Sequence, residues 1–549
     1  MLFFGVAYDE FVIEALLFDW KVIAAGIVGA GSAAYFVVIG LIFSALLVYF
    51  AARSISGAMV FFPQRIGAFV GIGIVLVSLL LVMVLARGTL GTFPLAQRYA
   101  AATASMELNK LVMNGSFALF TAVENFATSA EITPATQEQG RVAFKDYFGT
   151  EPSNEPVFDQ FYTSTPANPL VEEVKPHVFL GIVESLSSSF LDKEYTGSGQ
   201  LSQRLMAHFE EDVWFSRFTP AHNFTQGSIA NITGLNYPII SQSRHRRHSL
   251  DSAAAKVFKQ KGYRTVYIYS GFESVRDGAN YYLRQGFDEF IGANFLLKHY
   301  PDMPLNVWGG EDYYAFDYAK KLLQESDEPL FIVMHTLTNH PPYASPSLPW
   351  LDKDLEINDQ MRDVNGSLPD EALRTYHYTS EVVGEFLDFV KQGVLSQKTL
   401  IALTGDHGIR GAKSTSDTEL LTKAVPFYLY APAQLKPSIA IDTDVLGSHR
   451  DILPTIYNLA LSEARYLNLG NDLFSARDVS SEFAILHGQI LTNEGYIYPG
   501  QDEAVRSYAE PDSFIYGNRQ PLQDKEALNK AQAYLNAIDW LKRYQLQNK

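Results

Sequence analysis

Five short apolar runs, separated by longer segments, limit what this chain can fold into. Runs of this length with few charges are typical of strands that are buried on both faces of a sheet. Helical patterns lie between several of them, as at Glu371–Gln392. Alternating strands and helices predict an α/β fold with a mostly parallel sheet. The five runs are Val178–Val183, Thr265–Tyr269, Leu330–Met334, Thr399–Leu403 and Val425–Tyr430.

Two longer apolar runs, Tyr35–Ala52 and Ile66–Ala86, precede this region. Each meets the roughly 20-residue length that a helix needs to cross a bilayer, so we expect about two transmembrane helices. The alternative is a pair of buried core helices. Arg53 and Arg65 place the loop between the runs in the cytoplasm, and the chain after Arg87 then lies outside. An external N-terminus without a preceding span favours further spans upstream of this sequence.

Composition excludes some classes of partner and chemistry. The formal net charge of −17 argues against a nucleic-acid partner, which favours a basic surface. The chain has no Cys, which excludes disulfides, thiolate metal ligands and a cysteine nucleophile.

Changes in composition and in hydrophobic pattern along the chain predict four parts. We expect a membrane region at 1–90, a juxtamembrane helix and tether at 91–170, a catalytic domain at 171–475 and a C-terminal extension at 476–549. The tether is expected because Ser129–Asn168 is rich in Thr, Pro, Asn and acidic residues. From Lys525 onward the pattern indicates a charged surface helix.

Metal-ligand residues follow two of the five apolar runs. Glu184 comes directly after the first run, and Asp406 and His407 follow the fourth, between Gly405 and Gly408. The carboxyl ends of parallel strands meet at one edge of a sheet, where ligands bind. Carboxylates and imidazoles are ligands of divalent cations. An acidic residue at a strand end is by itself usually a cap or a solvated charge, so the prediction of a metal site depends on the three residues acting together.

Thr225, in Thr225-Gln226-Gly227-Ser228, has two readings. A threonine in such a place is usually a helix N-cap. The start of a helix is also a good position for a nucleophile, because free N–H groups there stabilise a phosphate anion. Metal coordination would promote loss of the hydroxyl proton.

Taken together, three motifs resemble the signature of the alkaline phosphatase/sulfatase superfamily. More closely, they are similar to the lipoteichoic acid synthase type of membrane phosphoglycerol transferase. The resemblance covers the last two apolar spans and roughly residues 170–475. The motifs are Val183-Glu184-Ser185-Leu186, Thr225-Gln226-Gly227-Ser228 and Thr404-Gly405-Asp406-His407-Gly408, and Arg87–Leu95, Asn339–Tyr343 and His449–Thr455 also fit the group.

The resemblance implies an alkaline phosphatase-like fold, with a mostly parallel sheet flanked by helices and N-terminal transmembrane helices before it. It also implies that Glu184, Thr225, Asp406 and His407 surround one divalent cation, with Thr225 as the nucleophile. Mn²⁺ is the cation we expect first, and Zn²⁺ and Mg²⁺ are the alternatives.

Further site residues are implied in the same way. Arg276 is expected to contact the phosphoglycerol head group, although Ser274 stands where the family has a tryptophan. His340 is expected to hydrogen-bond the phosphoryl oxygen or the leaving group; the alternative is a capped turn before two prolines. His449 either completes the metal environment or caps the helix that follows. Trp308, in another family-like loop, is expected to pack near the site.

The activity implied is transfer of glycerophosphate from phosphatidylglycerol, through a threonine-linked intermediate, to a hydroxyl of an envelope glycan or lipid acceptor. The protein would be a multi-pass membrane protein with its catalytic domain on the extracytoplasmic side. The alternatives are a phosphoethanolamine transferase, and a phosphodiester or sulfate ester hydrolase of the same superfamily. A binding protein with a decayed site predicts loss of at least one of the four residues around the cation, and all four are present.

Overall fold

The computed structural model describes residues 133–547 apart from short gaps, and isolated positions (46, 49, 53, 76–78, 80 and 123) before them. The gaps are 223, 235–239, 243–244, 274, 276–277, 307, 342, 344–354, 437–440, 469, 476–480, 488, 498–503, 510–513 and 522–524. Arg276 and nearly all of Tyr35–Ala52 and Ile66–Ala86 therefore lie outside the described residues. Within the described part, no helix has both the length and the apolar character that a bilayer crossing needs. The chain divides into two compact units, Met1–Ser129 and Ala130–Lys549, and the second contains nearly all of the described residues.

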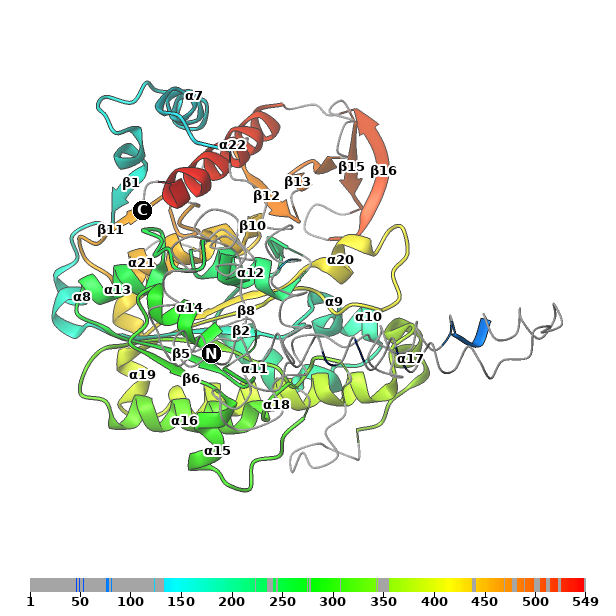
Figure 1. The fold of residues 1–549 in the computed structure, drawn as a ribbon. Helices are drawn as coiled ribbons and strands as arrows, with labels where there is room; N and C mark the ends of the chain where they lie inside the picture. The colour runs from blue at the N-terminus through cyan, green and yellow to red at the C-terminus, as the bar shows by residue number, and fades with distance from the viewer. Residues whose placement is uncertain are drawn as a thin grey trace. The chain divides into compact units, whose positions relative to one another are not determined.

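A seven-stranded sheet forms the centre of this second unit (Figure 1). Its strand order is β3-β9-β8-β2-β7-β5-β6. The pairs of β9 with β3 and with β8 are antiparallel, and the other pairs of this sheet are parallel. Each of the five apolar runs forms one strand, so the predicted mostly parallel α/β sheet is confirmed. The strands are β2 (His177–Val183), β3 (Val213–Phe215), β5 (Arg264–Tyr269), β6 (Glu289–Ile291), β7 (Leu330–His335), β8 (Thr399–Gly405) and β9 (Phe427–Tyr430).

Helices cover both faces of the sheet, because successive strand side chains point to opposite sides. Phe179 and Val183 of β2 belong to one core, and Leu180 and Ile182 belong to the other. The predicted helix at Glu371–Gln392 is present as α18, which lies below the sheet in Figure 1. The first core is completed by α11 (Gln203–Glu211), α16 (Asp312–Glu325) and α18 (Asp370–Val390), and the second by α12 (Thr225–Ile232), α13 (Ala254–Gln260) and α21 (Ile452–Ala460).

Shorter elements connect these layers. Two small two-stranded sheets are separate from the main one: β1 (Tyr162–Ser164) pairs with β11 (Arg465–Leu467), and β4 (Phe218–Thr219) pairs with β10 (Gly447–Ser448). The other short helices are α8 (Pro169–Val174), α9 (Ser188–Leu191), α10 (Lys193–Thr196), α14 (Gly278–Arg284), α15 (Ala293–His299), α17 (Asp359–Asn365), α19 (Leu395–Lys398) and α20 (Glu419–Lys423), with 3₁₀ turns η2 (Val157–Phe161), η3 (Gln200–Ser202), η4 (Ile240–Gln242), η6 (Ala433–Leu435) and η7 (His449–Asp451).

A second sheet, which the sequence did not predict, follows the main one. Its five strands are antiparallel and pair in chain order. Short antiparallel strands joined by tight turns leave only a weak periodic signal in a sequence. The strands are β12 (Phe483–Leu486), β13 (Gln489–Thr492), β14 (Gly495–Ile497), β15 (Ala504–Tyr508) and β16 (Tyr516–Pro521).

The predicted C-terminal helix exists as α22 (Glu526–Gln547), but one of its faces is part of a core. It packs beside α7 (Gln137–Phe148), which lies in the stretch expected to be a tether (Figure 1). Trp540 of α22 is 1% exposed and stacks on Phe161, with ring centroids 5.6 Å apart. Its indole N–H donates to the Thr136 carbonyl at 2.8 Å. From residue 133 onward this stretch is therefore folded, because apolar side chains spaced among its polar ones meet α22.

Arg450 joins the second sheet to the main one. Its guanidinium lies 3.7 Å from the ring centroid of Phe483 in β12 and 4.8 Å from that of Tyr534 in α22. Its Nη2 also donates to the Phe483 carbonyl at 3.1 Å. Cation–π contacts at such desolvated positions are worth about 2 kcal/mol each. Arg450 of η7 therefore helps to hold β12 and α22 in place.

Replacing Trp540 with Ala should destabilise the fold by about 3–5 kcal/mol, because it removes a buried aromatic ring that holds α7 and α22 together. Urea unfolding of the full chain in detergent, followed by tryptophan fluorescence and circular dichroism, measures the loss. Lys530→Ala, on an exposed position of the same helix, is the control and should change the free energy of unfolding by less than about 0.5 kcal/mol. A Trp540→Ala loss no larger than the control's would contradict the role of this core.

Candidate active site

The pairing of β2 with β8 brings the predicted metal ligands together. The two strands are parallel neighbours, with Val183 opposite Gly405. The residues that come after them, Glu184 and Asp406, therefore emerge side by side at the carboxyl edge of the sheet. The backbone N–H of Asp406 donates to the Val183 carbonyl at 3.2 Å and extends this pairing by one residue.

Backbone groups hold the Asp406 carboxylate in one orientation. Its Oδ1 accepts hydrogen bonds from the N–H groups of Ser185 at 2.7 Å and His407 at 2.8 Å. Ser185 adopts a left-handed backbone, with φ of 56°, which directs its N–H to this oxygen. The other oxygen, Oδ2, is buried and has no hydrogen-bond partner among the described residues. A buried carboxylate oxygen in this state is well suited to a cation.

The glycines that frame this motif serve close packing. A Cβ on Gly405 would clash with the Leu186 carbonyl, and one on Gly408 would clash with the Thr422 carbonyl. Neither glycine has the positive φ that only a sharp turn would require. These two glycines are therefore required for space rather than to let the backbone turn sharply after the strand.

His407 directs one ring nitrogen at the cluster. Its Nδ1 donates to the Gly408 carbonyl at 2.9 Å, so Nε2 carries the lone pair, which accepts a hydrogen bond from Arg410 Nη2 at 2.8 Å. Nε2 lies 3.4 Å from Asp406 Oδ2, 3.7 Å from Glu184 Oε1 and 3.4 Å from Thr225 Oγ1. His407 Nε2 thus lies within 3.7 Å of an oxygen of each of the other three residues of the expected cation site.

Thr225 is the first residue of α12, and Phe224 is its N-cap. The usual reading of this threonine as a capping residue is therefore wrong. Its hydroxyl lies instead toward the His407 ring. The N–H groups of the first turn of a helix have no partner within the helix, and such groups can bind a phosphoryl oxygen.

His335, which the sequence did not single out, belongs to the same cluster. It is the last residue of β7, the strand that pairs with β2 on the side away from β8. Ligand atoms of Glu184, His335 and Asp406 all lie within 4.8 Å of one another. The His335 ring stacks on Tyr269 at a centroid distance of 4.8 Å, and its buried Nε2 has no hydrogen-bond partner in the described part of the chain. The signal was available: a polar residue directly after a buried strand run, as at Glu184.

Burial shapes the ionisation of this cluster. Burial and the nearby Asp406 charge raise the pKa of Glu184 well above its usual value. Burial also opposes ionisation of Asp406, but His407 and the Ser185 N–H keep the pKa of Asp406 below its usual value. Burial lowers the pKa of His335 to about 4, so its imidazole is neutral and can act as a metal ligand. Two carboxylates this close are destabilised unless a positive charge joins them.

The donor set fits a divalent cation. Carboxylate oxygens, an imidazole nitrogen and a hydroxyl suit Mn²⁺, Zn²⁺ or Mg²⁺, and do not select among them. The unpartnered Asp406 Oδ2 and the neighbouring Glu184 carboxylate supply the negative charge that such an ion requires. The described residues hold another His/Asp/Glu group, at His208, Glu211 and Asp212, but the Lys391 ammonium contacts all three and already satisfies them.

His340 lies in a loop that Asp312 organises. Asp312 Oδ1 accepts from Leu337 N–H at 2.7 Å and Oδ2 accepts from Thr338 N–H at 2.8 Å. The His340 Nδ1 meets the Pro341 carbonyl at 2.7 Å, and Trp308 packs edge-on against the His340 ring at 4.7 Å. Burial lowers the pKa of His340. The expected packing of Trp308 near this loop is present.

His449 contacts backbone groups through both ring nitrogens. Nδ1 accepts from the Ala221 N–H at 3.2 Å, so Nε2 carries the proton and donates to the Gly405 carbonyl at 2.9 Å. The ring is fully buried, and burial lowers its pKa to about 3. Neither expectation for His449 is supported, because both ring nitrogens bond to backbone groups of Ala221 and Gly405, and Ser448 and Asp451 are the N-caps of η7 and α21. The residue ties the segment before Thr225 to the end of β8 and so positions both.

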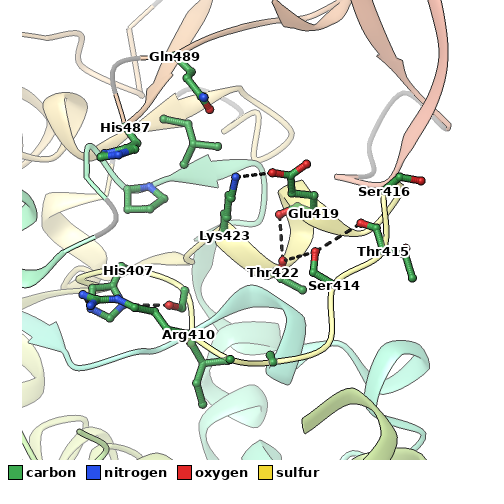
Figure 2. Close-up of a pocket in the computed structure, with 16 residues that line it drawn as sticks. His407, Arg410, Ser414, Thr415, Ser416, Glu419, Thr422, Lys423, His487 and Gln489 are labelled. Carbon is green, nitrogen blue, oxygen red and sulfur yellow. Dashed lines mark hydrogen bonds and ion pairs between the residues drawn. The ribbon is translucent and has the colours of Figure 1, made fainter. Parts of the chain in front are cut away.

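Arg410, which the sequence also did not single out, donates from Nη2 to His407 Nε2 at 2.8 Å. Figure 2 shows both residues at one end of a pocket. A guanidinium at this place can bind an anionic oxygen beside the metal ligands. Its position three residues after His407 in the sequence was a signal, but one that many surface arginines share.

Comparison with known proteins places the chain in a family. Residues 176–462 match the sequence profile of the family described as Sulfatase. The chain belongs to the sulfatase family.

Similar curated proteins include lipoteichoic acid synthases. Lipoteichoic acid synthase 1 of Bacillus subtilis (strain 168) is 25% identical over an alignment of 332 residues. The alignment covers 56% of this chain and 50% of that protein. Lipoteichoic acid synthase of Staphylococcus aureus (strain USA300) is 22% identical over 349 residues, which are 60% and 48% of the two chains. This sulfatase-family chain thus spans about half the length of the curated relatives it matches.

Solved structures show the fold. A protein of the alkaline phosphatase superfamily from Vibrio parahaemolyticus superposes with a TM-score of 0.55 at 19% identity, over 77% of this chain and 98% of that one. The lipoteichoic acid synthase LtaP from Listeria monocytogenes gives 0.54 at 15% identity, over 70% and 96%. The chain has an alkaline phosphatase-like α/β fold with a mixed, mostly parallel central sheet.

Replacing Asp406 with Asn should abolish most of the stabilisation that Mn²⁺ gives. At a Mn²⁺ concentration about 100 times the dissociation constant, the parent should gain about 2.7 kcal/mol, seen as a higher melting temperature. The asparagine oxygen still accepts from Ser185 and His407, so the variant should fold without metal. Asp327→Asn, at an exposed position, is the control and should keep the full shift. An undiminished Mn²⁺ shift in Asp406→Asn would remove Asp406 from the ligand set.

Proposed function

We propose that this sulfatase-family chain is a metal-dependent phosphoglycerol transferase. It moves glycerophosphate from phosphatidylglycerol to a hydroxyl of an envelope glycan or lipid, through an intermediate linked to Thr225. The observation that carries the proposal is the Thr225 hydroxyl at the start of α12, 3.4 Å from His407 Nε2 in the carboxylate cluster. The similarity to proteins named lipoteichoic acid synthases supports the choice of donor.

The first step is attack by Thr225 Oγ on the phosphorus of the donor. A divalent cation held by Glu184, Thr225, Asp406 and His407 would lower the pKa of the threonine hydroxyl and offset the charge of the phosphoryl oxygens. The N–H groups at the start of α12 stabilise the same oxygens. The bond from phosphorus to the diacylglycerol oxygen breaks, and the glycerophosphoryl group remains on Thr225.

Two side chains assist departure and orientation. His340 gives its proton to the diacylglycerol oxygen; its lowered pKa makes the protonated imidazole a stronger acid. Arg410 binds a phosphoryl oxygen beside His407, which takes up charge that develops in the transition state. Arg276 is assigned to the glycerol head group from the family resemblance, and its contact stays a prediction.

The apolar runs before residue 90 fit this assignment. A donor embedded in a bilayer is best reached by a catalytic domain held close to the membrane. We therefore assign the protein to the cell membrane as a multi-pass protein, with the catalytic domain outside, as the arginines that flank these runs suggest.

Thr225→Ala should reduce diacylglycerol release from head-group-labelled phosphatidylglycerol by roughly 10³-fold or more, as losses of a covalent nucleophile do. The assay uses the full chain in detergent with Mn²⁺, and mass spectrometry of the peptide that contains residue 225 detects the glycerophosphoryl adduct. Thr225→Ser should keep the adduct. Thr163→Ala, in β1, is the control.

Each part of the proposal has its own contrary outcome. No diacylglycerol release by the parent would overturn the donor, and faster release from phosphatidylethanolamine would favour the phosphoethanolamine transferase. Equal release by parent and Thr225→Ala would overturn the nucleophile. An adduct that only water removes, with every hydroxyl compound tried, would identify a hydrolase.

A further inference from the structure

A cavity of about 580 Å³ opens beside His407, on the side of Arg410. Its volume lies within the range of small-molecule sites. Figure 2 shows His407 and Arg410 on one side, the β12–β13 turn with His487 and Gln489 opposite, and Lys423 of α20 between them. Two segments far apart in the sequence thus enclose the space.

One wall of the cavity lies outside the part of the chain that matches the sulfatase family. The match ends at residue 462, whereas Leu486, His487 and Gln489 belong to the second sheet. The metal ligands and the nucleophile all lie before residue 462. One side of the cavity therefore comes from the sulfatase-family part of the chain, at His407 and Arg410, and the other side comes from the C-terminal extension.

The lining suits a ligand with several hydroxyl groups. Ser414, Thr415 and Gln489 each offer both a donor and an acceptor, as sugar and polyol hydroxyls require. Lys423 and Glu419 form an ion pair at 2.6 Å, which offers both kinds of partner at one place. Side chains that can pack against C–H faces of a sugar or polyol complete the lining: Pro220, Ile409, Ala412 and Leu486.

His487 carries a conformational cost at the turn. It follows β12 in a two-residue connection to β13, with Leu486 paired to Gln489, and its φ is 53°. Tight hairpin turns with positive φ favour Asn or Gly at such a position. The imidazole lines the cavity and lies 6.0 Å, between ring centroids, from His222. A strained residue whose ring lines a cavity points to a role in binding.

We propose that this cavity binds the acceptor, as the hydroxyl end of a sugar or a polyol, and that His487 contacts it. This inference rests on the proposed function. His407 lines the cavity, and its Nε2 lies 3.4 Å from Thr225 Oγ1, so one residue of the cavity wall is in direct contact with the residue that would carry the group. The acceptor oxygen forms a bond to phosphorus, and the bond from phosphorus to Thr225 Oγ breaks. The electron pair returns to Oγ, and the acceptor's hydroxyl proton restores the threonine hydroxyl.

The test measures how the glycerophosphoryl group is divided between acceptor and water. The full chain in detergent receives labelled phosphatidylglycerol, Mn²⁺ and one soluble acceptor, either glycerol, glucose or maltose. His487→Asn removes the imidazole but tolerates a positive φ, so its melting temperature should equal or exceed the parent's. The ratio of transfer product to free glycerophosphate should fall at least tenfold. His299→Ala, at an exposed position of α15, is the matched control and should keep the parent's ratio.

The outcomes separate this inference from the proposed function. An unchanged ratio in His487→Asn with all three acceptors would overturn the acceptor site. A change with the sugars alone would identify a glycan, and a change with glycerol alone would identify a glycerol polymer. If the parent releases no diacylglycerol, the donor assignment fails, and ligand-observed NMR with the same three compounds decides the site. Binding by the parent that His487→Asn loses would support the site, whereas no binding, or equal binding, would overturn it.

Discussion

The arrangement of the site depends on the burial of two carboxylates next to each other. Glu184 and Asp406 come after adjacent parallel strands, so the sheet itself forces them together. Backbone N–H groups satisfy only one oxygen of Asp406, and the other stays unpartnered among the described residues. Isolated from a positive charge, such a pair opposes folding. A divalent cation held there would offset this cost, because the sheet already orients the two carboxylates. The same rigid edge then determines where Thr225 and His407 must lie.

Two buried polar residues, Asp312 and His449, position the loops around the site through hydrogen bonds to their backbone. Asp312 orients the segment that ends at His340, through hydrogen bonds to two successive backbone N–H groups. His449 links the segment before Thr225 to the Gly405 carbonyl. The next residue, Arg450, packs on Phe483 and Tyr534 and so attaches the second sheet. His449 and Arg450 together therefore position the loop before Thr225 and the second sheet, which forms the far wall of the cavity. This explains why His449 belongs to the site although it is not one of the expected ligands.

Sequence alone predicted the parts of this protein that carry a strong local signal. All five apolar runs became strands, and α18 agrees with its predicted helix within about two residues. Glu184, Asp406 and His407 were identified because each follows such a run. His335 follows one too, but a single histidine after a strand carries little weight until the strand order puts it beside Glu184. The contribution of His487 was out of reach, because it depends on how a second sheet packs, and pairing between short antiparallel strands is a long-range property. The buried face of α22 was missed for the same reason: its partner α7 lies far earlier in the chain.

The two walls of the cavity differ in how freely their side chains can change. Next to Asp406, the N–H groups of Ser185 and His407 hold one carboxylate oxygen, and a Cβ on either flanking glycine would clash with a carbonyl. A substitution there disturbs the ligands directly. The β12–β13 turn is attached through backbone pairing and through Arg450, so the side chains of His487 and Gln489 can be exchanged without moving a metal ligand. A favourable turn residue at 487 would also relieve the left-handed strain. The backbone conformation at position 487 therefore favours Asn or Gly over histidine. A role of the imidazole in binding at the cavity would explain why histidine is present there.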